Sequence, residues 1–87
     1  MADVEIYTTP WCPFCVRVRM LLESKGVSFR NIDVNSDPAL REEMMHRAGG
    51  RHTVPQVFVD GVYVGDSDAL HRLDEERKLD AILGIER

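Results

Sequence analysis

The sequence predicts an α/β fold, a mixed four-stranded sheet with flanking helices in the order β-α-β-α-β-β-α. Three observations predict it. Apolar residues alternate in some segments and recur at three- and four-residue intervals in the segments between them. In the C-terminal half, Asp60-Gly61 separates two short runs of β-forming residues, which is typical of a hairpin. The 87 residues allow one domain, residues 1–87.

The N-terminal elements follow from apolar spacing. Val4–Tyr7 alternates apolar and polar side chains, which predicts a strand that Thr8–Trp11 ends. From Pro13 the apolar positions 14, 18, 21 and 22 follow a helical period, and Lys25-Gly26 is a stop signal. Val27–Val34 is rich in β-forming residues and predicts a second strand. Because a helix joins these strands, we expect them to be parallel.

The C-terminal elements are marked by caps and turns. Residues 37–48 are expected to form a helix with Asp37 as its N-cap and proline at its first position. Residues 57–59 and 62–64 are the antiparallel hairpin strands. A last helix is expected after Gly65, capped by one of residues 66–68. An apolar stripe at positions 79, 82 and 83 should close the core.

Composition excludes several classes of protein. The formal net charge of −4 argues against a nucleic-acid partner. No apolar run approaches the roughly eighteen residues that a membrane span needs, so no membrane partner is expected. The first residues are acidic where a secretory signal would be basic and then apolar. We therefore expect a cytoplasmic protein.

Cys12 and Cys15 form a C-x-x-C pair, which favours redox chemistry. As a staple, so small a ring would remove only about 2 kcal/mol of unfolded-state entropy. Zinc would need two more ligands, but there is no second C-x-x-C, and the three histidines are spaced by six and nineteen residues. We expect these histidines at the surface. Two buried small side chains remain the plainer alternative for the cysteines.

The position of the pair assigns different roles to its members. Cys12 lies at the start of the predicted helix, where free N–H groups and the helix dipole favour a negative charge. Arg17 and Arg19 add positive potential. Cys15 lies inside the first turn, so we expect it to be more buried and less acidic. Cys12 is then the attacking nucleophile and Cys15 the resolving thiol.

Three motifs together resemble a known family. The segment Ile6–Cys15 (IYTTPWCPFC), the tripeptide Thr53–Pro55, and Gly65 followed by Ser67-Asp68 are similar to a dithiol glutaredoxin of the small bacterial type, with the thioredoxin-like fold. The likeness runs from about Val4 to Leu83. It implies a glutathione-dependent oxidoreductase that reduces protein disulfides and glutathione mixed disulfides, in redox homeostasis and electron transfer.

The resemblance also implies partners. Glutathione would be the reductant and co-substrate, with no metal cofactor. The clients would be disulfide-containing or glutathionylated proteins, ribonucleotide reductase among them, and the protein would be a monomer.

The resemblance further implies a glutathione site, formed by Pro13, Phe14, Thr53, Val54, Pro55, Gly65, Ser67 and Asp68. Pro55 would be a cis proline facing Cys12, and the Val54 backbone would pair with the glutathione cysteinyl main chain. The last helix would hold the γ-glutamyl end, with N–H groups on its carboxylate and Asp68 on its amine.

Each of these residues also has a structural interpretation. Pro55 could simply start a strand, and Ser67 and Asp68 could simply cap a helix. Phe14 could pack over glutathione or only against the domain. We expect Trp11 to be exposed as a contact surface for partners. Either Arg41 or Arg51 is a candidate for the glycyl carboxylate.

Two positions depart from the family pattern. Thr8 stands where many members carry lysine, and Asp66 stands where a second glycine is usual. Three alternatives stay open from the residues alone. The first is a thioredoxin-like reductase fed by a flavoprotein, and the second is a glutathione-ligated [2Fe–2S] carrier, against which Pro13 argues. The third is a non-catalytic glutathione-binding module, which leaves Cys15 without a purpose.

Overall fold

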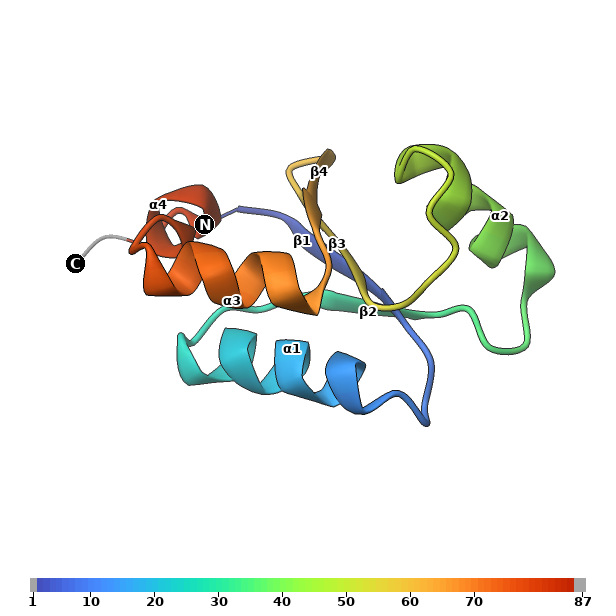
Figure 1. The fold of residues 1–87 in the computed structure, drawn as a ribbon, viewed down its shortest axis with the longest axis horizontal. Coiled ribbons are helices and arrows are strands. Elements are labelled where there is room, and N and C mark those ends of the chain that lie inside the picture. The colour runs from blue at the N-terminus through green and yellow to red at the C-terminus, as the bar shows by residue number, and fades with distance from the viewer. Residues whose placement is uncertain (1, 86–87) are drawn as a thin grey trace.

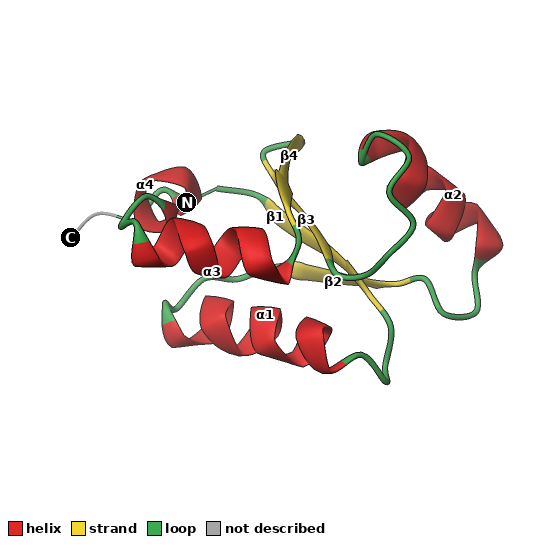
Figure 2. Cartoon of the chain, in the orientation of Figure 1, coloured by secondary structure: helices red, strands yellow, loops and turns green. Residues whose placement is uncertain are grey.

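The computed structural model describes residues 2–85. In these residues, four strands form one mixed sheet in the spatial order β2-β1-β3-β4 (Figure 1, Figure 2). The strands are β1 (Val4–Thr8), β2 (Arg30–Asp33), β3 (Gln56–Val59) and β4 (Val62–Gly65). β1 pairs in parallel with β2 and antiparallel with β3, and β3 and β4 form an antiparallel hairpin. The expected sheet is confirmed.

Four helices flank the sheet, namely α1 (Pro13–Ser24), α2 (Pro38–Arg47), α3 (Ser67–Glu75) and α4 (Leu79–Leu83). α1 and α3 lie side by side on one face, and α2 lies on the other (Figure 1). The Asp37 carboxylate caps α2 by accepting from the N–H groups of Ala39 and Leu40, both at 3.1 Å. No helix within residues 2–85 is long and apolar enough to cross a membrane.

Alternation along the strands produces two cores. From β1, Ile6 faces the α1 side and Tyr7 faces the α2 side. From β3, Val57 faces the α1 side and Phe58 faces the α2 side. The core on the α1 side contains Val4, Ile6, Val18, Leu22, Val27, Val57, Val59, Leu70, Leu79 and Leu83. The smaller core under α2 contains Tyr7, Val34, Met44, Ala48 and Phe58.

The second strand is shorter than the sequence predicts, because its first residues finish the preceding helix. β2 begins at Arg30 instead of Val27. The Val27 N–H donates to the Leu22 carbonyl over 3.1 Å, and Gly26 turns the chain with a φ of 71°. This is how a helix C-terminus satisfies its last carbonyls.

The C-terminal apolar stripe forms a separate helix, which adds an eighth element to the predicted order. Arg77, with a φ of 61°, separates α3 from α4. Leu79 and Leu83 enter the main core, whereas the Ile82 side chain is exposed. Lys25 Nζ joins the two helices to α1 by pairing with Asp74 at 2.7 Å and Asp80 at 2.6 Å. The stripe therefore covers the core as expected, from a helix of its own.

A polar network that the sequence did not reveal fastens α2 to β1. The Arg47 guanidinium donates to the Glu5 carboxylate at 3.0 and 3.2 Å and to the Tyr7 hydroxyl at 2.7 Å. The same guanidinium lies 4.1 Å from the centre of the Phe58 ring. The hydrogen bond from Arg47 holds the pKa of the Glu5 carboxyl below its usual range, although burial opposes this. The network positions α2 and hence the loop that follows it.

Candidate active site

The two cysteines lie where β1 leads into α1, and they are linked by a hydrogen bond. Cys12 is the N-cap of α1, and its Sγ atom accepts from the Cys15 N–H over 3.3 Å. On its other side, the Cys12 thiol donates to the Val54 carbonyl over 3.7 Å. Both cysteines are free thiols in this structure. The cap position thus gives Cys12 Sγ a hydrogen-bond donor from the first turn of α1.

Cys15 is the buried member of the pair, with no exposed surface. The pKa of its thiol is raised to about 11, chiefly by burial and also by hydrogen bonding and charge interaction with Cys12, while a backbone hydrogen bond with Thr9 and the charge of Arg19 oppose the rise. The prediction that Cys15 is the more buried cysteine is confirmed, and the pKa of its thiol lies above the ordinary value.

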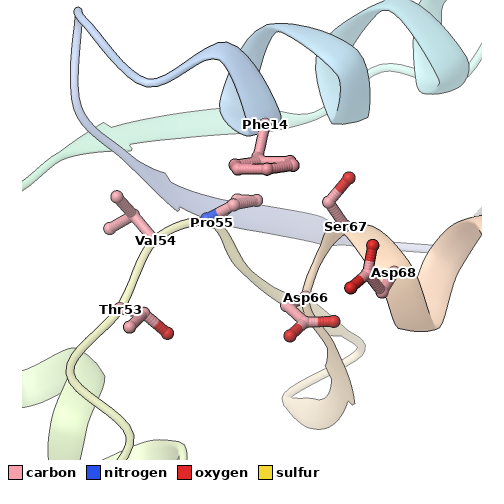
Figure 3. A pocket seen from close by; sticks show the side chains of 7 residues that line it. All are labelled: Phe14, Thr53, Val54, Pro55, Asp66, Ser67 and Asp68. Carbon is pink, nitrogen blue, oxygen red and sulfur yellow. The ribbon is translucent and has the colours of Figure 1, made fainter.

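A pocket of about 160 Å³ opens beside Cys12, next to Val54. Its walls come from α1, from the loop before β3 and from the start of α3, and they consist of Phe14, Thr53, Val54, Pro55, Asp66, Ser67 and Asp68 (Figure 3). The Val54–Pro55 peptide bond is cis, as the resemblance implies. Phe14 lies over Pro55 (Figure 3), so its ring forms the roof of the pocket.

Six of the eight residues expected to form the binding site line this pocket. Pro13 does not: it occupies the exposed first turn of α1. Gly65 does not line it either. A Cβ at Gly65 would lie 2.5 Å from the Ala69 Cβ, and the φ of 143° favours glycine. Gly65 therefore allows α3 to approach β4 closely, which places the α3 N-terminus at the pocket.

The charges around the pocket are unevenly placed. Asp66 and Asp68 lie at the start of α3, where Asp66 caps the helix by accepting from the Ala69 N–H over 3.0 Å. Arg41 donates to the His52 carbonyl over 2.9 Å, and the Arg51 guanidinium lies 5.3 Å from the Tyr63 ring centre. Neither arginine lines the pocket, but Arg41 holds the loop next to Thr53.

Other side chains around the pair are placed largely as expected. The Trp11 side chain, next to the nucleophile, is 81% exposed. His46 and His52 are exposed, whereas His71 is half-buried, with Nδ1 lying 2.8 Å from the Ser67 carbonyl. All three histidines reach the surface, although the ring of His71 is partly covered because it lies back against the first turn of α3. Within residues 2–85, no group of three or more His, Cys, Asp or Glu side chains is arranged to hold a metal ion.

The prediction missed one polar residue behind the pocket. Gln56 is fully buried, and its Nε2 donates to the Thr53 carbonyl at 2.9 Å and to the Thr53 hydroxyl at 3.2 Å. Its Oε1 accepts from the Tyr63 hydroxyl over 2.7 Å. The signal available in the sequence was a long polar side chain at the start of the apolar run Gln56–Val59, directly after Pro55.

Comparisons with known proteins agree with this geometry. A sequence model of the glutaredoxin family matches residues 4–64. Glutaredoxin 3 of Escherichia coli K12 is 49% identical over 83 residues, which is 95% of this chain and 99% of that protein. A glutaredoxin of Pseudomonas aeruginosa is 47% identical over 83 residues, covering 95% of this chain and 98% of that one.

A solved structure extends the likeness to the fold. The solution structure of glutaredoxin from Brucella melitensis superimposes with a TM-score of 0.84 at 49% identity, covering 95% of this chain and 89% of that one. The chain belongs to the glutaredoxin family and is a thiol–disulfide oxidoreductase, whose two neighbouring cysteines fit a dithiol active site.

Proposed function

We propose that glutathione binds in the pocket beside Cys12, and that the protein uses it to reduce protein disulfides and glutathione mixed disulfides. The observation that carries this proposal is the double role of Val54. Its carbonyl lies 3.7 Å from Cys12 Sγ, and the same residue lines the pocket. A thiol compound bound in the pocket would therefore have its sulfur beside the nucleophile.

The polar groups around the pocket match the ends of glutathione. The nine-residue helix α3 begins at the pocket, so its free N–H groups can receive the γ-glutamyl carboxylate. The carboxylate of Asp68 can pair with the neighbouring amine. At the other end, Arg41 and Arg51 supply positive charge near Thr53 for the glycyl carboxylate. The cysteinyl part would then lie along the Val54 backbone.

The reduction of a client disulfide proceeds by two exchanges. The Cys12 thiolate attacks one client sulfur, forms a mixed disulfide and releases the other client sulfur as a thiolate, which takes up a proton. Cys15 then loses its proton and attacks Cys12 Sγ, which releases the second client thiol and leaves a Cys12–Cys15 disulfide. Two glutathione thiols restore the dithiol and leave as glutathione disulfide, so the electrons and protons balance.

The pKa of Cys15 suits it to act second. Burial, together with the hydrogen bond and charge of Cys12, holds the pKa of Cys15 at about 11 in the dithiol. Once Cys12 is part of a mixed disulfide, its contribution to raising that pKa disappears. The Cys15 thiol then ionises more readily at the stage when it must attack. Cys12 is therefore the thiol that attacks the client first, and Cys15 is the thiol that resolves the mixed disulfide.

The choice of reductant tests the proposal. Turnover of a glutathionylated peptide is measured with glutathione, glutathione reductase and NADPH, and separately with thioredoxin reductase and NADPH. We expect turnover only with glutathione. Turnover with thioredoxin reductase and none with glutathione would instead support a flavoprotein-fed reductase.

We also propose that the protein acts in the cytoplasm, on clients that include ribonucleotide reductase, as the resemblance implies. The clients can be captured directly, because a Cys15→Ser variant cannot resolve the mixed disulfide that Cys12 forms with them. Release of trapped proteins by dithiothreitol, compared with a Cys12→Ser control that cannot trap, would identify them. Absence of ribonucleotide reductase from the trapped proteins would remove it as a client.

A further inference from the structure

We infer that Gln56 and Tyr63 are positioning residues for the reaction: a hydrogen-bonded relay through the buried Gln56 that sets the orientation of the Val54 main chain at the active site. This rests on the proposed function, because Val54 is where the glutathione main chain would pair. Neither side chain lines the pocket, so both act through the loop that does.

The relay runs from β4 through β3 to the loop. The Tyr63 hydroxyl donates to Gln56 Oε1 over 2.7 Å, which leaves Gln56 Nε2 facing the loop. Nε2 then donates to the Thr53 carbonyl at 2.9 Å and to its hydroxyl at 3.2 Å. Gln56 has no exposed surface, so water cannot replace these bonds. The amide therefore has one orientation, with its acceptor toward Tyr63 and its donor toward Thr53.

Fixing the Thr53 carbonyl also fixes the Val54 N–H. The two groups belong to one trans, planar peptide unit, so they point in opposite directions. Because Gln56 draws the Thr53 carbonyl toward the interior, the Val54 N–H is turned the other way. The carbonyl on the other side of Val54 accepts from the Cys12 thiol over 3.7 Å. The relay thus sets the N–H of the residue whose carbonyl contacts the Cys12 thiol.

The ring of Tyr63 is itself held in place. It packs against the Phe58 ring with centres 5.3 Å apart, and the Arg51 guanidinium lies 5.3 Å from its centre. Arg41 binds the preceding carbonyl, that of His52, over 2.9 Å. Two consecutive carbonyls of the loop are therefore each pinned by a side chain, and Gln56 pins the one nearer to Val54.

Two variants test the inference without altering any pocket residue. Tyr63→Phe removes only the hydroxyl, and Gln56→Met keeps the length of the side chain but removes both hydrogen-bonding groups. With a glutathionylated peptide as substrate, we expect KM to rise about fivefold to tenfold in each, with kcat within about twofold of wild type. The double variant should resemble Gln56→Met alone, because Tyr63 acts through Gln56.

Val59→Ala is the matched control, since it removes buried volume from the same strand at a distance from the loop. It should lower the unfolding temperature and leave KM unchanged. An unchanged KM in Tyr63→Phe and Gln56→Met would overturn the inference, as would an equal rise in the control. If Gln56→Met does not fold, Tyr63→Phe alone decides between these outcomes.

A second measurement needs no substrate. The amide NMR signal of Val54 should shift in both variants relative to wild type and stay unchanged in the control, because each variant releases the Thr53–Val54 peptide plane. An unshifted Val54 signal in both variants would overturn the relay. If wild type shows no turnover with glutathione while the signal shifts as expected, the proposed function fails and the relay stands.

Discussion

The backbone N–H of Cys15 donates to the Sγ atom of Cys12 over 3.3 Å, so Cys15 helps to hold the Cys12 side chain in place. Cys12 acts on Cys15 in turn, because hydrogen bonding and charge interaction between the two side chains raise the pKa of the Cys15 thiol. The two thiols, one helical turn apart, therefore lie in different environments: Cys12 is half-buried beside the pocket, and Cys15 is buried.

The raised pKa of Cys15 should make the stability of the reduced protein fall at alkaline pH. Burial, together with the interaction with Cys12, raises the pKa of Cys15 from 9.0 to about 11. A pKa that is raised in the folded state contributes stability below the unfolded pKa, and this is lost as pH rises through the folded value. Reduced wild type should therefore lose stability relative to Cys15→Ser between about pH 9 and pH 11. Urea unfolding across this range checks it, and a constant difference would contradict it.

Trp11 should report the redox state of the pair. It is covalently next to Cys12, and its side chain is 81% exposed. A nearby disulfide or a changed environment should alter its emission when the pair is oxidised. Titration in glutathione redox buffers should show one two-electron transition in wild type and none in Cys12→Ser. Identical emission from the oxidised and reduced wild type would show that Trp11 does not sense the pair.

Asp66 should weaken the binding of glutathione. At about 5 Å, two like charges repel by about 1–3 kcal/mol between effective dielectric constants of 20 and 80, and salt reduces this. Asp66→Gly should therefore lower the KM for glutathione several-fold, more at low ionic strength, because loss of a cap to glycine costs only a few tenths of a kcal/mol.

A matched pair of variants separates charge from capping. Asp66→Asn keeps an oxygen that can accept from the Ala69 N–H and should also lower KM. Asp68→Asn should raise KM, because its carboxylate is proposed to pair with the glutathione amine. Steady-state assays at low and high salt distinguish the two. No change for Asp66→Gly and Asp66→Asn at either salt concentration would place the Asp66 charge away from the bound ligand.

Arg47 should contribute substantially to the stability of the fold, although it lies outside the active site. Arg47→Met would leave the buried Glu5 carboxylate with Arg30 as its remaining partner and remove the bond to Tyr7. We expect a loss of about 2 kcal/mol near pH 7. The pKa of Glu5 is lowered by Arg47, so this part of the stability is present above pH 4.5 and lost as pH falls through the lower folded value.

Arg30→Met is the control for this prediction, since Arg30 pairs with the same carboxylate at 3.0 Å from a largely exposed position. Its loss should cost less than about 1 kcal/mol. Denaturant unfolding of both variants provides the comparison. Equal losses would show that the contacts of Arg47 with Tyr7 and Phe58 add nothing.

Most of the fold could be predicted because local sequence patterns determine it. Alternation in β1 and β3, the proline and aspartate at the start of α2, and the Asp60-Gly61 turn each depend on neighbours in the sequence. The errors lie where distant groups decide. Residues 27–29 were expected in a strand, but their conformation is set by the end of α1. The break at Arg77, which separates α4 from α3, has no glycine to mark it in the sequence.

The same distinction holds at the site. Cys12 and Cys15 could be read from their spacing, and the pocket residues from a resemblance covering nearly the whole chain. The Gln56–Tyr63 relay and the Arg47 network could not, because each joins residues whose partners are known only once the strands are paired. A buried polar residue reveals its role through its contacts, and those are tertiary.

The central claim is that Cys12 attacks and Cys15 resolves, and a comparison of Cys12→Ser and Cys15→Ser in two glutathione-coupled assays tests it most directly. Cys12→Ser should be inactive toward both a glutathionylated peptide and a protein disulfide. Cys15→Ser should still turn over the glutathionylated peptide, which needs only the nucleophile and free glutathione, but fail on the protein disulfide, which needs a resolving thiol. Equal losses for both variants in both assays would contradict the assignment.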